Sequence, residues 1–88
     1  MSEEYWYNRF MRDVVQHRKK FKISCAFCGK EILTYEIYVN LHRKTNKRYA
    51  CLKCYYKLLN DFQKQIFKKV LNEKFKIPID EIEKLLQE

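Results

Sequence analysis

The sequence predicts a small α+β domain, and three observations lead to this fold class. Residues 2–20 and the stretch that begins at Leu52 both repeat apolar side chains at helical spacing. Residues 32–42 instead alternate apolar and polar side chains, as a half-buried strand does. Four cysteines stand in two pairs among these elements. With 88 residues the chain is a single domain whose hydrophobic core is small, so a staple is expected to help hold it.

The first expected element is a helix over residues 2–20, which makes residues 1–22 a helical N-terminal extension. Ser2 is a suitable N-cap, and basic residues stand in the last turn, where the helix dipole favours cations. Trp6 and Phe10 share the apolar stripe of this helix. We therefore expect the helix to pack on the core through these two rings.

A β-hairpin is expected next along the chain. Residues 32–42 place five apolar side chains on one face of a strand, namely Leu33, Tyr35, Ile37, Val39 and Leu41. Residues 44–47 are polar and predict a turn, after which Arg48, Tyr49 and Ala50 return as a short second strand. The hairpin therefore lies between the two cysteine pairs.

A long amphipathic helix is expected from Leu52 onward. Its apolar stripe covers five turns and consists of Leu52, Tyr55, Tyr56, Leu59, Phe62, Ile66 and Val70. A stripe of lysines on roughly the opposite side consists of Lys53, Lys57, Lys64 and Lys68. The pair Ile77-Pro78 ends the helix, and Asp80 with Glu83 resembles a capping box that starts a short helix within residues 79–88. The central core of the domain is thus expected to span residues 23–76.

The cysteines predict a metal site. Cys25, Cys28, Cys51 and Cys54 form two pairs, each with a two-residue spacer, which lets one tight turn present two sulfurs to one ion. Gly29 follows the first pair, where such a turn adopts a positive φ at no cost to glycine. No secretory signal is visible, so we expect a reducing compartment in which metal is favoured over disulfides. One structural Zn²⁺ bound by these four thiolates is the prediction.

The layout of a knuckle, a hairpin and a helix that carries the second cysteine pair resembles the treble-clef zinc fingers. A zinc ribbon is the alternative, but the second pair has no Gly or Pro beside it and leads directly into the helix. The run Cys51-Leu-Lys-Cys54-Tyr-Tyr-Lys-Leu is also faintly similar to the end of a GATA-type finger. The longer gap between the pairs and the missing strand tryptophan depart from that family. The resemblance implies a zinc-stabilised α+β fold and favours DNA binding.

Enzymatic readings fit the sequence less well. His42 and Asn46 lie between the cysteine pairs, as catalytic residues do in HNH nucleases. Those enzymes carry an Asp-His or His-His pair and a longer insert, whereas His42 here follows Leu41 and the insert is short. Two redox-active cysteine pairs are a second alternative, which one shared metal explains better. His17 and His42 are expected to be solvated. We therefore expect no enzymatic activity.

The charge distribution predicts a polyanionic partner. The net charge of +8 divides into −2 for residues 1–8, +13 for residues 9–79 and −3 for residues 80–88. Four thiolates and one Zn²⁺ lower the total to about +6, which still attracts polyanions. We expect a regulatory factor, for example of transcription, that binds nucleic acid, with DNA favoured over RNA. The expected contact residues are Arg18, Lys19, Lys20, Arg43, Lys44, Lys47, Arg48, Lys53 and Lys57. Tyr38 and Tyr49 could stack on bases.

A protein-binding adaptor or inhibitor, acting on an acidic partner or as a homodimer, is the alternative function. It rests on a surplus of aromatic side chains, namely Tyr5, Trp6, Tyr7, Tyr55, Tyr56, Phe67 and Phe75. No stretch approaches the roughly 20 apolar residues that cross a bilayer. We expect an intracellular protein, in the cytoplasm or in a nucleus.

Overall fold

The computed structural model describes residues 2–41 and 47–87, and these residues form an α+β domain. The helices are α1 (Glu3–Asp13), α2 (Leu52–Lys57), α3 (Asp61–Phe75) and α4 (Ile79–Leu86). The strands are β1 (Val14–Gln16), β2 (Ile23–Ser24), β3 (Glu31–Ile32), β4 (Ile37–Asn40) and β5 (Tyr49–Cys51). One antiparallel sheet has the order β1-β4-β5, and β2 pairs with β3 in a separate hairpin. The predicted α+β class is confirmed.

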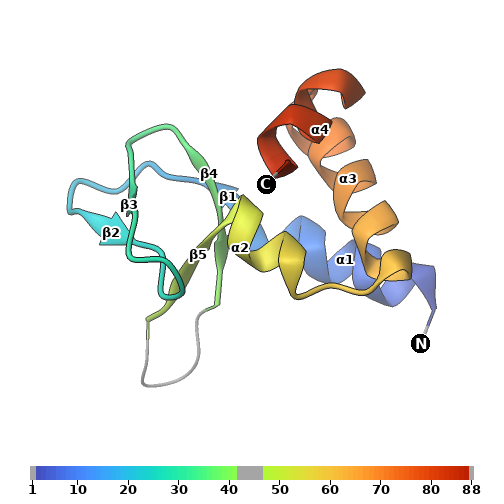
Figure 1. Cartoon of the computed structure of the whole chain (residues 1–88), viewed down its shortest axis with the longest axis horizontal. Helices are drawn as coiled ribbons and strands as arrows, with labels where there is room; N and C mark the ends of the chain where they lie inside the picture. The colour runs from blue at the N-terminus through green and yellow to red at the C-terminus, as the bar shows by residue number, and fades with distance from the viewer. Residues whose placement is uncertain (1, 42–46, 88) are drawn as a thin grey trace.

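The three-stranded sheet divides the molecule into two halves. Val14 pairs with Val39 and Val39 with Ala50, so these side chains form one row on the face that packs against the helices. Successive strand residues point to opposite faces, and accordingly Val15 and Tyr38 pack on the other face against the β2–β3 hairpin. Figure 1 shows α1, α3 and α4 at one end of the molecule and β2 and β3 at the other.

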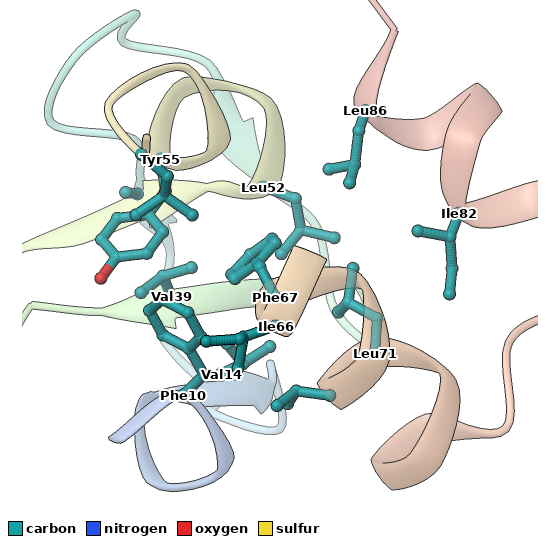
Figure 2. Packing of buried hydrophobic residues seen from close by; sticks show 13 residues of the cluster. Phe10, Val14, Val39, Leu52, Tyr55, Ile66, Phe67, Leu71, Ile82 and Leu86 are labelled. Carbon is teal, nitrogen blue, oxygen red and sulfur yellow. The ribbon is translucent and has the colours of Figure 1, made fainter. Parts of the chain in front are cut away.

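Below, residues 17–57 are called the finger half, and residues 1–16 and 58–88 the helical half. The main core joins the helical half to the sheet. Phe67 is fully buried at its centre, with ring centroids 5.3 Å from Phe10 and 5.7 Å from Tyr55. Figure 2 shows these rings together with Ile66, Leu71 and the α4 side chains Ile82 and Leu86. The finger half has only a small cluster of its own, with Ile23, Ile32 and Tyr38 as the buried members among the described residues.

The N-terminal helix is shorter than residues 2–20. Ser2 caps it as predicted, because its Oγ accepts a hydrogen bond from the Tyr5 N–H at 3.3 Å. The helix ends at Asp13, and the β-branched residues that follow pair with β4 instead. The Lys74 ammonium donates to the carbonyls of Met11 and Val14 at 2.5 and 2.6 Å, which satisfies acceptors at this helix end. Phe10 is buried as predicted, and Trp6 packs against the core while half-buried.

The predicted strand over residues 32–42 is interrupted by a turn. The Glu36 N–H donates to the Leu33 carbonyl, and the Leu33 N–H donates to Glu36 Oε1 at 2.7 Å. Tyr35 adopts a positive φ of 74°, so the alternation cannot continue through it. Leu33 and Tyr35 are therefore exposed, contrary to the predicted apolar face. The return strand β5 is confirmed at Tyr49–Cys51, whereas most of the polar turn lies outside the described residues.

The long helix predicted from Leu52 is two helices. Asn60 starts α3 with a capping box, because its Oδ1 accepts from the Gln63 N–H while its own N–H donates to Gln63 Oε1, both at 2.9 Å. Phe62 is consequently 48% exposed rather than part of a buried stripe, and Leu71 is buried in its place.

The C-terminal helix begins two residues earlier than the predicted capping box requires. Pro78 holds the N-cap position of α4 and makes no side-chain cap bond. The predicted box of Asp80 and Glu83 is therefore wrong, because Asp80 already lies inside the helix. The break at Ile77-Pro78 is confirmed.

Replacing Asn60 with alanine is expected to lower the free energy of unfolding by about 1 kcal/mol, because the first turn of α3 loses its cap. Urea unfolding followed by circular dichroism measures the loss. Asn8→Ala is the control, because Asn8 is exposed within α1 and caps nothing. Equal stability of Asn60→Ala and the native protein would contradict the structural role of this box.

Candidate metal centre

The first cysteine pair lies on a tight turn between β2 and β3. The Gly29 N–H donates to the Cys25 carbonyl at 2.9 Å, and the Cys25 N–H donates to the Lys30 carbonyl at 2.9 Å. Gly29 has the expected positive φ, 75°, while a Cβ at this position would meet no atom within 4 Å. The glycine is therefore required for its backbone conformation and not for space.

The second pair lies where β5 passes into α2. Cys51 ends the strand and holds the N-cap position of the helix, and Cys54 lies in the first turn. The Ala26 N–H donates to the Tyr49 carbonyl at 2.7 Å, next to a β-bridge between Cys25 and Tyr49. These backbone contacts hold the turn against β5 and bring the two pairs together.

The four sulfurs form one cluster. All of them lie within 4.8 Å of one another, and the Sγ atoms of Cys28 and Cys51 are 3.9 Å apart. None of the four cysteines is in a disulfide. Four thiolates that surround one Zn²⁺ at about 2.3 Å are about 3.8 Å apart, so the cluster has the dimensions of a tetrahedral zinc site.

The electrostatics of the cluster call for a cation. Burial opposes ionisation of Cys25, but backbone N–H groups of Cys51, Cys28 and Phe27 outweigh it and lower the pKa of this thiol to about 6. The Phe27 N–H donates to Cys25 Sγ at 3.4 Å. Burial and then the neighbouring sulfurs raise the pKa of Cys54 to about 12. The thiolate of Cys25 is thus favoured, while the thiol of Cys54 resists ionisation until a metal ion neutralises its charge.

Among the described residues, the ligand cluster consists of the four cysteines and includes no histidine or carboxylate. His17 is not solvated as predicted, since only 2% of it is exposed. Its Nδ1 accepts a hydrogen bond from the Lys19 N–H at 3.3 Å, and its ring meets Tyr38 edge to face. His17 is therefore a core residue of the finger half. His42 and Asn46 lie outside the described residues.

The predicted nucleic-acid contacts are spread over several elements. Arg18, Lys19 and Lys20 are exposed in the connection between β1 and β2, not in a helix. Lys47 and Arg48 are exposed just before β5, and Lys53 and Lys57 are exposed on α2. Arg43 and Lys44 lie outside the described residues.

Two predicted surface features are corrected by the structure. The lysine stripe is not continuous, because the break before α3 separates Lys57 from Lys64, which lies with Lys68 over the ring of Tyr56. Tyr38 is buried and offers no ring for stacking, while Tyr49 is half-buried.

The structure contains a groove beside the sulfur cluster that the sequence did not predict. It has a volume of about 650 Å³ and is lined by three of the cysteines, by Tyr35 and by the lysines Lys30, Lys53, Lys57 and Lys84. We call it the lysine groove. The lysines come from the turn after β2, from α2 and from α4. The packing of α4 beside α2 and the contacts of the first cysteine turn with β5 bring them together. No periodicity or motif of the sequence indicates such a juxtaposition.

Fold and site together define this chain as a small α+β domain with a four-cysteine cluster fit to hold a metal ion. Comparison with protein-family models, curated proteins and solved structures gives no match for it. None of the described helices is both long and apolar enough to cross a bilayer.

Proposed function

We propose that this chain is a small, basic zinc-finger protein that binds nucleic acid, with DNA favoured, and acts as a regulatory factor. The observation that carries the proposal is the division of charge between the two halves. The finger half contains eleven lysines and arginines against two glutamates, a net charge of +9. The helical half sums to −1. A polyanion is therefore attracted to the finger half and not to the molecule as a whole.

The basic side chains of the finger half are available to solvent. All nine of its described lysines and arginines are exposed: Arg18, Lys19, Lys20, Lys22, Lys30, Lys47, Arg48, Lys53 and Lys57. Both ion pairs among the described residues lie elsewhere, on α1, where Arg9 and Arg12 converge on Asp13 at 3.8 and 3.1 Å. Four thiolates with one Zn²⁺ leave the finger half at about +7, which still supports phosphate binding.

The metal ion in this proposal is one structural zinc in a treble-clef arrangement. The order of the β2–β3 knuckle, the β4–β5 hairpin and α2 with the second cysteine pair supports that arrangement. Four sulfur ligands complete a tetrahedral shell and leave no position for water or substrate, so the zinc performs no chemistry. Its function is to arrange the basic surface.

Replacing Lys19, Lys20, Lys47 and Arg48 together with glutamine is expected to weaken binding to a mixed-sequence duplex and to flatten its salt dependence. The slope of log Kd against log salt is expected to change by about 1 for each replaced residue that contacts a phosphate. Fluorescence anisotropy of a labelled duplex between about 50 and 200 mM salt measures both quantities.

The control for this variant removes the same number of charges from the helical half, through Lys64, Lys68, Lys69 and Lys76 to glutamine. Its affinity and slope are expected to stay close to those of the native protein. Equal effects of the two variants would contradict the assignment to the finger half. If the native protein shows no salt-dependent binding to either a duplex or a single-stranded oligonucleotide, nucleic acid is rejected and the protein-binding alternative is favoured.

The alternative, a protein-binding adaptor or homodimer, is supported by one surface feature. Leu58 at the end of α2 and Phe62 in the first turn of α3 are both exposed, on either side of the turn between the two helices. Two of the aromatic residues expected on the surface, Tyr55 and Phe67, are instead buried in the main core. The apolar surface is therefore smaller than the composition suggests, and light scattering of the zinc-loaded protein tests self-association.

A further inference from the structure

The lysine groove contains an exposed aromatic ring in a strained position. Tyr35 has a φ of 74°, which is a rare conformation for an aromatic residue and costs free energy relative to glycine or asparagine. The residue is 70% exposed, so burial in a core does not offset this cost. A local sequence optimised for stability alone would place glycine here, as the metal turn does at Gly29.

Hydrogen bonds from a neighbouring strand hold the backbone of Tyr35. Its N–H donates to the His17 carbonyl at 2.8 Å, and Gln16 Nε2 donates to the Tyr35 carbonyl at 3.0 Å. His17 is itself buried. The backbone is thus fixed while the ring projects outward, which is the arrangement of a preformed contact surface rather than of a mobile loop tip.

The charges around the ring favour an anion. In the part of the chain that the structure describes, Lys30, Lys53, Lys57 and Lys84 line the groove together with one carboxylate, that of Glu36, which accepts a hydrogen bond from the Leu33 N–H. A zinc–thiolate cluster beside the groove would carry about −2, so the lining keeps a net positive charge. The volume of about 650 Å³ lies within the roughly 300–1,000 Å³ of small-ligand sites. A groove of this volume accommodates a single nucleotide but not a duplex.

We propose that the lysine groove binds an unpaired nucleotide of a single-stranded nucleic acid. The ring of Tyr35 stacks on the base, and Lys30, Lys53 and Lys84 contact the adjoining phosphates. This inference rests on the proposed nucleic-acid function. It adds that the ligand is single-stranded and that the lysine groove is where it binds. The lysines alone would account for binding of an acidic peptide, which does not require an exposed aromatic ring. The ring of Tyr35 is present although its backbone conformation costs stability, and a stacked base explains it.

Replacing Tyr35 with glycine tests the inference. The variant removes the ring and relieves the positive φ, so its urea midpoint is expected to equal or exceed that of the native protein. Its affinity for a labelled single-stranded oligonucleotide of mixed sequence is expected to fall about tenfold, the loss of one stacked base. Affinity for a duplex of the same sequence is expected to stay unchanged. A Tyr35→Gly variant that is at least as stable as the native protein but binds the single strand more weakly shows that Tyr35 contacts the ligand and does not support the fold.

Three further variants complete the experiment. Tyr35→Phe keeps the ring and is expected to bind the single strand as the native protein does. Tyr5→Leu removes an exposed tyrosine from the helical half and is expected to have no effect on binding. Should Tyr35→Gly fail to fold, Tyr35→Asn carries the same test, because asparagine also tolerates a positive φ.

The outcomes separate this inference from the proposed function. Native binding that Tyr35→Gly leaves unchanged overturns the inference and leaves the nucleic-acid function in place. Absence of binding to both the strand and the duplex overturns both. A poly-glutamate peptide serves as the acidic-peptide probe. If it binds the native protein as tightly as the oligonucleotide does, and if Tyr35→Gly weakens that binding, a nucleotide is not the specific occupant of the groove.

Discussion

Replacing Cys54 with serine is expected to abolish tight zinc binding and to unfold the finger half. The small cluster of Ile23, Ile32 and Tyr38 is its only separate core among the described residues, and three buried side chains cannot hold the β2–β3 hairpin. Structural zinc sites contribute an apparent 10–16 kcal/mol, roughly as much as the whole stability of a domain of this size, about 4–13 kcal/mol. The separate cluster that the described residues of the finger half form is too small to replace that contribution.

Two measurements check this expectation. Zinc per chain, determined by competition with a chelating dye, is expected to fall from one to about zero. Circular dichroism in the near and far ultraviolet is expected to lose the signal of the packed tyrosines and of the strands. Acidification is expected to have the same effect on the native protein, because protons compete with zinc for the thiolates.

Ser24→Ala is the matched control for the cysteine variant. Ser24 is exposed on β2, beside the first ligand, and its change is expected to leave zinc binding and the spectra unaltered. A Cys54→Ser protein that keeps the native spectra in the presence of a chelator would show that the metal does not hold the finger half.

Replacing Phe67 with alanine is expected to lower the free energy of unfolding by about 3–5 kcal/mol. The ring is fully buried and meets three other rings, those of Phe10, Tyr55 and Tyr56, with centroids 5.3–6.2 Å away. It lies where α1, α2 and α3 converge, so the structure cannot close the resulting cavity without moving a helix. Urea unfolding of the zinc-loaded protein measures the loss.

Phe62 offers a control on the same helix. Its ring is 48% exposed, and Phe62→Ala is expected to cost less than about 1 kcal/mol, because little apolar surface is removed from the interior. Similar losses for the two phenylalanines would contradict the observed break between α2 and α3. A continuous helix from Leu52 would have buried Phe62 instead.

Local chemistry, and therefore the sequence by itself, determined the four-cysteine cluster of the candidate metal centre. The two-residue spacers, the glycine after the first pair and the return strand that leads into a helix are short-range features, and each lies where it was expected. Ser2 and the break at Pro78 belong to the same group. The capping box of Asn60 and Gln63 was also readable, but the apolar periodicity from Leu52 to Val70 conceals it. Short-range features of this kind depend on backbone groups within a few residues.

Only the tertiary structure decided how the chain is divided. Val14 leaves a helical pattern because β4 offers it a pairing partner distant in sequence, and Tyr35 leaves a strand pattern because β1 holds its backbone. The burial of His17 and the lysine groove follow from the same packing. These outcomes depend on contacts between segments far apart in the chain, which periodicity and spacing do not record. Each cysteine pair could be predicted from the residues of its own turn. The surface around the four cysteines forms only when α4, α2 and the β3–β4 turn pack together.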